Sequence, residues 1–355
     1  MGKILLQEEL TRFRGRLRQG CVSCDNATVS DEMPLDEISD QVEAGSASVS
    51  VIIPCFNQGR FLSQAIESVI GQSQHIHEII VVNDGSTDNT ATVSASYPEV
   101  STISQSNQGL AAARNAGFHS STGSFLIFLD SDDCLAPTAV ETHLRCFADH
   151  PKAAFVVGDI DQVSEDGRPS ASPRWPLLKG EFYAELLRAN HVANTIAVMF
   201  KRDALLQIGE YEAAFAPAED YHLLLRAARL LPSAHHRDVV AFYRRHQDSM
   251  SRNGLPMLIA MEKIMRSQYE FVHGNPRLEA AWMEGRRYWQ DYFSKTTLRQ
   301  VFRLFQQGQP GRACSIAVDL FARSRGRVFL LPWKFRKRGF DLLRRTLMRT
   351  PQRLD

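Results

Sequence analysis

The 355-residue sequence lacks any run of about eighteen apolar residues, so a membrane-spanning helix is not expected. It also lacks regular cysteine spacing: six scattered cysteines predict reduced thiols and a cytoplasmic location. Cys21 and Cys24 form a CxxC, but no second pair lies near enough to complete a zinc site. The N-terminus shows neither a signal peptide nor a myristoylation motif. A formal net charge of +1 argues against nucleic-acid binding through overall charge.

Two glycine-rich phosphate motifs are absent as well. No GxGxxG follows a predicted strand, which disfavours a dehydrogenase. The stretch IIPCFNQGRF does not resemble the glycine-rich, Lys- or Arg-bearing loop that a nucleotidyltransferase normally carries after its first strand. Both α/β enzyme classes are therefore the weaker alternatives.

Charge is unevenly distributed along the chain. Residues 1–20 predict a basic amphipathic helix, and residues 21–47 hold seven acidic residues without Lys or Arg, which predicts a flexible linker. Residues 323–355 hold eleven Lys and Arg against two Asp, with aromatic and aliphatic residues between them. Such a segment suits an anionic membrane surface. The alternative is a helix that packs on the rest of the chain or on a partner.

Strand-like and helical patterns alternate from residue 49, which predicts an α/β fold with a mostly parallel sheet flanked by helices. The expected strands are 49–54, 78–83, 101–104, 124–130, 153–160, 194–201 and 238–246, and the first helices 61–70, 88–96 and 110–119. From residue 255 to 355 helical periodicity predicts a helical C-terminal region. The aromatic residues at helical spacing are expected to form its core, and one or two of them could instead stack on a sugar acceptor: Trp282, Tyr288, Trp289, Tyr292 and Phe293.

Polar clusters follow three of the predicted strands: PCFNQG, NDGSTD and DSDD. Ligands of open α/β sheets bind at the carboxyl ends of the strands, so these clusters favour one site. Asp130, Asp132 and Asp133 bring three carboxylates together, and oxygen ligands suit Mg²⁺ or Mn²⁺. Such a metal keeps positions open for a diphosphate. Taken alone, each cluster has the simpler alternative of a turn or helix cap.

The segment NQGLAAARNAG (107–117) adds three polar features to this edge. Gly109 permits close backbone approach, Arg114 offers a cation for a phosphate, and Asn115 can contact a base or orient a neighbour. The alternative is a small-residue helix packed on the sheet, with Arg114 in solvent.

Taken together, VSVIIPCFNQGRFLSQAIESV, EIIVVNDGSTDNT, NQGLAAARNAG and FLIFLDSDD resemble the family 2 glycosyltransferases, in that family's order and spacing. The resemblance implies a GT-A catalytic domain over residues 48–254. It also implies a nucleotide-sugar donor, Mn²⁺ or Mg²⁺, and inversion at the anomeric carbon. A UDP-sugar is the expected donor, and GDP- and dTDP-sugars are the alternatives. The QxxRW element of the family's processive members is absent, which implies transfer of a single sugar.

The resemblance also assigns residues to the donor and the metal. The residues expected at the donor are Pro54, Asn57, Asn83, Asp84, Gly109, Arg114, Asn115, Asp130 and Asp132. Asn83 stands where the family commonly has Asp. The residues expected at the metal are Asp132, Asp133 and His246. His246 lies in FYRRHQDSMSRN, which resembles the family's YRxHxxSxS, and Arg244 or Arg245 would add charge there. A lone histidine at a strand end is more often structural.

A second acidic pair resembles the family's ED element. In GEYEAAFAPAEDYHLLLRAAR, Asp220 would be the general base, with Glu219 beside it. An acceptor hydroxyl must lose its proton as it attacks the anomeric carbon. The alternative is a pair of acids at a helix N-terminus.

The expected protein is therefore a soluble or peripheral cytoplasmic transferase in polysaccharide or glycoconjugate synthesis. Its acceptor would be carbohydrate, lipid-linked or protein-linked, and no nucleic acid is expected as partner. The alternative from another class is a non-catalytic nucleotide-sugar-binding subunit of a glycan assembly complex.

Overall fold

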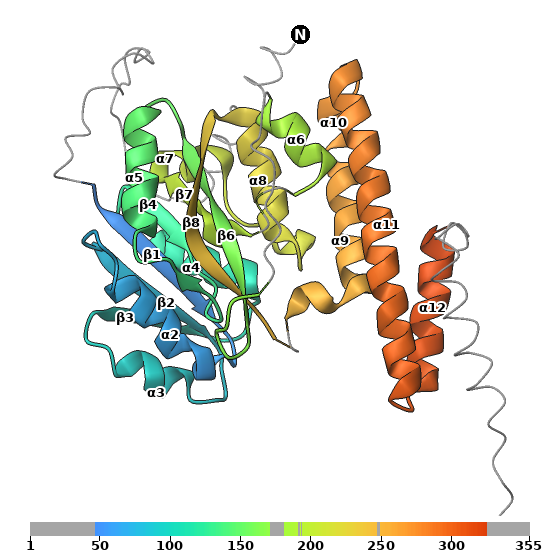
Figure 1. Cartoon of the computed structure of the whole chain (residues 1–355), viewed down its shortest axis with the longest axis horizontal. Coiled ribbons are helices and arrows are strands. Elements are labelled where there is room, and N and C mark those ends of the chain that lie inside the picture. Colours follow the sequence, from blue (N-terminus) through green and yellow to red (C-terminus); the bar gives the residue numbers. More distant parts are fainter. Residues whose placement is uncertain (1–46, 171–180, 191, 193, 247–248, 325–355) are drawn as a thin grey trace, which may run out of the picture. The chain divides into compact units, whose positions relative to one another are not determined.

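The computed structural model of this chain describes residues 47–170, 181–190, 192, 194–246 and 249–324 (Figure 1). All of them belong to one compact unit, Val42–Asp355. The predicted helix 1–20, the linker up to residue 46 with its CxxC, and the basic segment from residue 325 onward lie outside the described residues. The domain border predicted at residue 254 stays a prediction.

The strands of the described residues form one sheet in the order β3-β2-β1-β4-β7-β6-β8-β5. Their bounds are β1 (Val49–Cys55), β2 (Glu78–Asp84), β3 (Val100–Gln105), β4 (Phe125–Phe128), β5 (Cys134–Leu135), β6 (Phe155–Ser164), β7 (Val198–Lys201) and β8 (Ser233–Arg245). Strands β3, β2, β1 and β4 are parallel, as predicted. Strand β7 lies antiparallel between β4 and β6, β6 and β8 are parallel, and β5 is antiparallel to β8. The sheet as a whole is therefore mixed.

Helices connect and cover these strands. Their bounds are α2 (Gly59–Ile70), α3 (Thr90–Ala95), α4 (Leu110–Ser120), α5 (Ala139–Asp149), α6 (Phe182–Arg188), α7 (Arg202–Ile208), α8 (Glu219–Leu230), α9 (Gly254–Ser267), α10 (Tyr269–Val272), α11 (Pro276–Gln306) and α12 (Pro310–Ser324), with 3₁₀ turns η2 (Thr195–Ala197), η3 (Ala213–Phe215) and η4 (Met250–Arg252). The three helices predicted between the first strands are confirmed as α2, α3 and α4. Helices α2 and α3 each connect two neighbouring parallel strands, and α4 connects β3 to β4, which pairs with β1.

Several predicted strands have different limits in the structure. The strand predicted at 194–201 begins at Val198, because Thr195–Ala197 form the 3₁₀ turn η2, and the strand predicted at 153–160 spans Phe155–Ser164. The strand predicted at 124–130 ends at Phe128, so Asp130 belongs to the loop that follows β4. The strand predicted at 238–246 begins earlier, at Ser233, because β8 pairs with β6 along its whole length through two register shifts.

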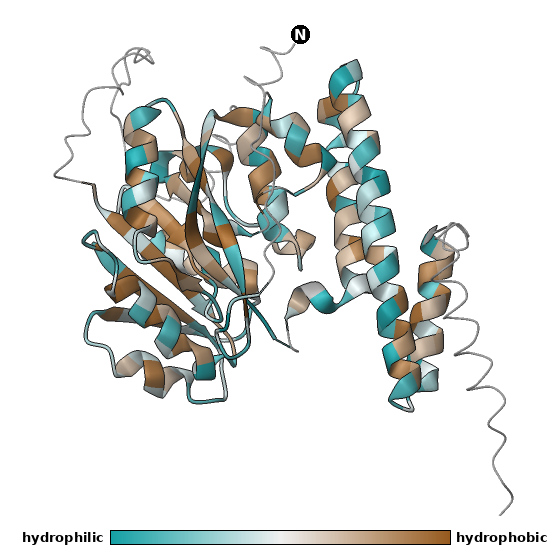
Figure 2. Cartoon of the chain, in the orientation of Figure 1, coloured by the Kyte–Doolittle hydropathy of each residue, from teal (hydrophilic) through white to brown (hydrophobic). Residues whose placement is uncertain are grey.

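The core lies around the central strands. Every residue of β1 is buried, and Val51, Ile52 and Ile53 are completely so. In Figure 2 these central strands are mostly coloured as hydrophobic. Each such side chain stabilises the fold by about 1.5–3 kcal/mol. Helix α4 approaches this layer closely at Gly117, where an added Cβ would lie 2.3 Å from Ile52 Cγ2. The core thus fixes the strand ends that carry the polar clusters.

Helix α11 organises the C-terminal region. Its N-terminus is capped by the Asn275 side chain, which accepts from the N–H groups of Arg277 and Leu278. It contacts α6, α9 and α12. The predicted aromatic core is confirmed for Trp289 and Phe293, which are buried, whereas Tyr288 and Tyr292 on the same helix are exposed. Within the described ranges, every helix is too short or too polar to span a lipid bilayer.

Helix α11 meets α6 through a glycine. A Cβ added at Gly285 would lie 1.8 Å from the carbonyl oxygen of Leu187, so Gly285→Ala must push the two helices apart. We expect this variant to lower the free energy of unfolding by about 1–3 kcal/mol, measured by denaturant titration. Gly311→Ala in α12 is the matched control, because its added Cβ meets no atom within 4 Å. Equal effects of the two variants would contradict the packing argument.

Candidate functional site

The loops after β1 and β2 are joined at the carboxyl edge of the sheet. Asn57 Oδ1 accepts from the backbone N–H of Thr87 at 2.8 Å, and the Asn57 N–H donates to Ser86 Oγ at 3.0 Å. Asn57 has a left-handed backbone with φ of 53°, which asparagine tolerates better than most residues. Asn83 Oδ1 accepts from the N–H of Ser86 at 2.9 Å. Hydrogen bonds of Asn57 therefore connect the two predicted donor-binding loops, which follow β1 and β2.

Asp84 holds the loop that leads into α4. Its Oδ1 accepts from the Gln108 N–H at 2.9 Å and from Gln105 Nε2 at 2.8 Å, and its Oδ2 accepts from the Gly109 N–H at 2.9 Å. Gly109 has φ of 88°, a conformation that favours glycine. Asp84 is buried, so its direct contact with a base stays a prediction. What the structure adds is a second role, in orienting the loop that would face the donor.

Pro54 is buried, and the partly exposed Asn115 already has partners within the protein for both ends of its amide. Pro54 lies buried within β1 opposite Val82 of β2. Asn115 uses both ends of its amide on the backbone of Tyr211, donating to the carbonyl at 2.9 Å and accepting from the N–H at 3.0 Å. Of the two roles predicted for Asn115, the orienting one fits this geometry.

Arg114 lies inside the protein. Its guanidinium donates to Asp130 Oδ1 at 2.7 Å and to Glu219 Oε1 at 3.0 Å, and the side chain is only 2% exposed. It also lies 5.1 Å from the ring centre of Tyr211. A phosphate contact would require Arg114 to leave two carboxylates in a buried place, so this geometry disfavours the predicted phosphate role. Arg114 instead neutralises acidic residues of the site.

The DSDD motif divides into residues with different exposure. The Asp132 side chain is 24% exposed, and its Oδ2 lies 2.7 Å from His246 Nε2. The side chain of Asp133 is buried, and its Oδ1 accepts from the backbone N–H of Arg244 at 2.7 Å. Burial raises the pKa of both carboxyls, and the nearby acids of the motif raise it further. Of the two predicted carboxylate ligands, Asp132 is therefore the more exposed, while Asp133 Oδ2 is buried and accepts no hydrogen bond from the described residues.

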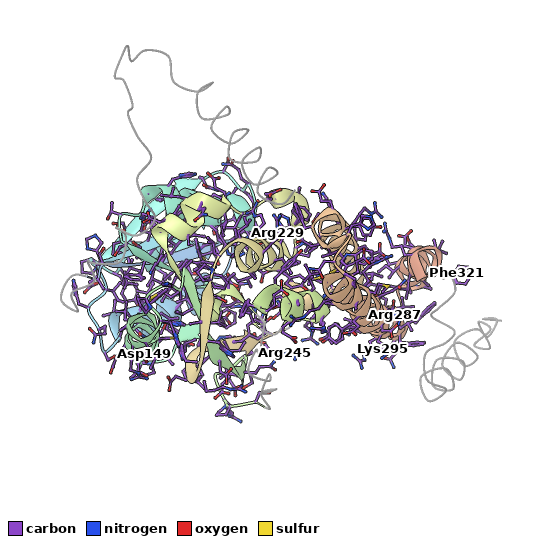
Figure 3. The ribbon with its side chains drawn as sticks, turned by 90° about the horizontal axis from the view of Figure 1, so that it is seen from above. Asp149, Arg229, Arg245, Arg287, Lys295 and Phe321 are labelled. Carbon is purple, nitrogen blue, oxygen red and sulfur yellow. The ribbon has the colours of Figure 1, made fainter. Side chains whose placement is uncertain are left out.

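Arg244 connects several parts of the site through hydrogen bonds, a structural role that the sequence did not predict. Its guanidinium donates to the carbonyls of Asp132 and Glu165, both at 2.8 Å, and to Gln64 Oε1 at 2.7 Å. It thereby ties the acidic motif to α2 and to the end of β6. The neighbouring Arg245 is exposed at the end of β8 and is labelled in Figure 3. Arg244 contributes structure here, while Arg245 retains solvent contact.

The side chains of Asp132 and His246 can hold a divalent metal only if a bound diphosphate supplies further oxygen ligands. Asp132 and His246 face each other, but no group of three His, Cys, Asp or Glu side chains among the described residues is arranged to hold a metal. Mg²⁺ typically binds through one or two carboxylates plus substrate phosphates. Asp132 with His246 suits a site of this kind, which is completed by a diphosphate.

The predicted general base opens α8. Asp220 Oδ1 accepts from the backbone N–H of Tyr221 at 2.7 Å, and the side chain is partly exposed. Burial, followed by the charge of Glu219, raises the pKa of Asp220 to about 7, against the opposing charge of Arg114. A carboxylate with a pKa near the working pH is well suited to accept a proton. Glu219 is buried and bonded to Arg114, so it does not share that accessibility.

Sequence comparison relates the chain to known transferases. Residues 50–209 match the profile described as Glycosyl transferase family 2. An uncharacterized glycosyltransferase of Haemophilus influenzae is 30% identical over 182 residues, which is 50% of this chain and 61% of the relative. A chondroitin synthase of Escherichia coli is 29% identical over 192 residues, 53% of this chain and 27% of the relative. The chain thus matches less than two thirds of the length of these relatives.

Solved structures with little sequence identity share the fold. Residues 1–349 of S. aureus TarS, in complex with UDP, superpose with a TM-score of 0.54 and 16% identity, covering 87% of this chain and 94% of that one. The mannosyltransferase PcManGT of Pyrobaculum calidifontis, in complex with GDP-Man and Mn²⁺, gives 0.53 and 16%, covering 84% and 87%. These similarities confirm the predicted GT-A architecture with its helical C-terminal region.

Proposed function

We propose that this chain is a family 2 glycosyltransferase, supported by the match of residues 50–209 to that family's profile, and that it transfers one sugar from a nucleotide-sugar to an acceptor hydroxyl with inversion. The observation that carries the proposal is the position of Asp220, whose side chain is partly exposed in the first turn of α8, beside the buried Glu219. Burial and the charge of Glu219 raise the pKa of Asp220 to about 7. Arg114 bonds both Glu219, the neighbour of Asp220, and Asp130 of the DSDD motif. The predicted base and the predicted donor-binding motif are therefore connected through one arginine.

In this mechanism Asp220 accepts the proton of the acceptor hydroxyl as the oxygen attacks the anomeric carbon. Attack comes from the face opposite the departing diphosphate, which inverts the configuration. The loops fixed by Asn57, Asn83 and Asp84 would receive the nucleotide, and Asp130 would face its ribose or sugar. Close backbone approach at Gly109 favours such a contact.

Asp132 and His246 would hold Mn²⁺ or Mg²⁺ together with the diphosphate. When bound, the metal supplies positive charge that stabilises the leaving diphosphate. The Mn²⁺ complex of PcManGT supports the use of a divalent metal. Asp133, bonded to the Arg244 backbone, would act as the support of that loop rather than as a ligand.

We infer a UDP-sugar as donor, supported by the UDP complex of TarS. Because PcManGT was solved with GDP-Man, guanine nucleotides are also included in the test below.

The acceptor is a carbohydrate, free or linked to lipid or protein, in polysaccharide or glycoconjugate synthesis, as the chondroitin synthase relative suggests. We further propose a cytoplasmic reaction at the anionic inner face of the membrane, supported by the eleven Lys and Arg and the interleaved apolar residues of the sequence segment 323–355.

The direct test is thermal shift with a panel of nucleoside diphosphates and nucleotide-sugars, with and without Mn²⁺. We expect one nucleotide, UDP, to stabilise the protein, and to do so only with the metal. Stabilisation by 100 Kd of ligand is worth about 2.7 kcal/mol, which is readily measured. The cognate nucleotide-sugar should then be hydrolysed slowly without acceptor. Binding without any turnover would favour the non-catalytic subunit, and no binding by the folded protein would refute both functions.

A further inference from the structure

One guanidinium joins two carboxylates from distant parts of the chain. Arg114 of α4 bonds Asp130, which follows β4, and Glu219, which opens α8. The side chains of Arg114 and Glu219 are 2% and 3% exposed. A buried ion pair is held in place strongly once formed, because either partner alone would be a buried unpaired charge. Arg114 thus ties the predicted donor motif to the helix that presents Asp220.

Glu219 and Asp220 are neighbours in sequence with different surroundings. Glu219 is buried against Arg114, whereas Asp220 accepts from the N–H of Tyr221 and retains solvent contact. The charged groups that act on Asp220 are Glu219 and Asp130, both negative, and Arg114, which is positive. Two carboxyl groups whose surroundings differ in this way can take separate roles at one pH.

We propose that Arg114 is a positioning residue for transfer: it neutralises Glu219 and Asp130 and so leaves Asp220 as the member of the acidic pair that takes the acceptor proton. The proposal rests on the proposed function and assigns this arginine a role away from the phosphates. Glu219 is then a charge-setting neighbour of the base. It is not a second base.

Substitutions of Glu219 and of Arg114 should shift the pKa of Asp220 in opposite directions. Burial is the main cause of the raised pKa of Asp220, Glu219 raises it further, and Arg114 lowers it. Glu219→Gln keeps an oxygen for Arg114 but removes a negative charge. We therefore expect the acidic limb of the kcat/KM–pH profile to move down by roughly one pH unit or more. Arg114→Met should move the limb up by a similar amount, and Arg114→Lys should restore it towards that of the wild type.

Arg226→Gln is the matched control. Arg226 is also a largely buried arginine, lies on α8, and pairs with Glu212, but it is not one of the main charges that shift the pKa of Asp220. Its substitution should leave the acidic limb in place. An acidic limb that stays in place in both Glu219→Gln and Arg114→Met, or that moves in the same direction in these two variants, would overturn the proposal. A phosphate role for Arg114 would instead raise KM for the donor without moving the limb.

A second measurement depends neither on enzymatic turnover nor on whether the Arg114→Met variant folds. The thermal stability gained from Asp220→Asn is measured against pH in the wild-type and Glu219→Gln backgrounds, since it reports when Asp220 ionises. As pH rises, the stability gained from Asp220→Asn should reach its plateau at a lower pH in the Glu219→Gln background than in the wild type. Coincident curves would overturn the proposal, whereas an inactive wild type with separated curves would refute the proposed function alone.

Discussion

Replacing Asp220 by asparagine is expected to lower kcat for transfer by about 10²–10⁴-fold, the range for loss of a general base. Asparagine has nearly the same shape and can still accept from the Tyr221 N–H, but it cannot take the acceptor proton. Donor binding should change little, because this carboxyl is not among the groups assigned to the nucleotide. Steady-state kinetics and nucleotide titration measure the two quantities separately.

The same variant should be more stable than the wild type above neutral pH. The pKa of Asp220 is about 7 in the folded protein against an ordinary value of 3.8, so the unfolded chain releases this proton first. Between those values the unfolded state binds fewer protons, and stability falls as pH rises towards 7. We expect Asp220→Asn to raise the free energy of unfolding by up to about 4 kcal/mol at pH 8, and by little near pH 4.

Asp203→Asn is a suitable control for both effects. Asp203 also lies in the first turn of a helix, α7, but it is exposed. Its substitution should leave kcat unchanged and should not stabilise the protein at high pH. Retention of full activity by Asp220→Asn would remove Asp220 as the base. Lost activity without a pH-dependent gain in stability would instead show that the carboxyl is not perturbed by burial.

The general layout of the fold could be predicted because it depends on local patterns. Buried parallel strands require continuous apolar runs such as VSVIIP, and their crossovers require helices. The polar clusters at the strand ends were visible for the same reason. The mixed character of the sheet was not, since the direction of β7 depends on its pairing with β4 and β6 and not on its own residues.

The pairing of charges inside the site lay beyond the sequence. Arg114 and Glu219 are 105 positions apart, and Arg244 and Asp133 are 111 apart. A motif shows that an arginine or an aspartate is present, but not whether it faces solvent or a buried partner. This is why the sequence assigned Arg114 to a phosphate and Asp133 to a metal, while the structure gives both of them internal partners.

The second large effect is expected at Asp132. Asp132→Asn can keep its hydrogen bond to His246 but removes the negative charge that a divalent cation needs. We expect the Mn²⁺-dependent part of nucleotide binding to weaken by about 10–100-fold and kcat to fall by about 10²–10³-fold. Isothermal titration with UDP at fixed Mn²⁺, and again without metal, measures the first effect.

Asp133→Asn is the matched comparison, one residue away. Asp133 is buried and its pKa is raised well above the ordinary value, chiefly by burial, so a neutral side chain that still accepts from the Arg244 N–H should be tolerated. This variant should keep metal-dependent nucleotide binding. The opposite outcome, with Asp133→Asn losing the metal and Asp132→Asn retaining it, would mean that the motif rearranges when the diphosphate binds and that Asp133 is the ligand.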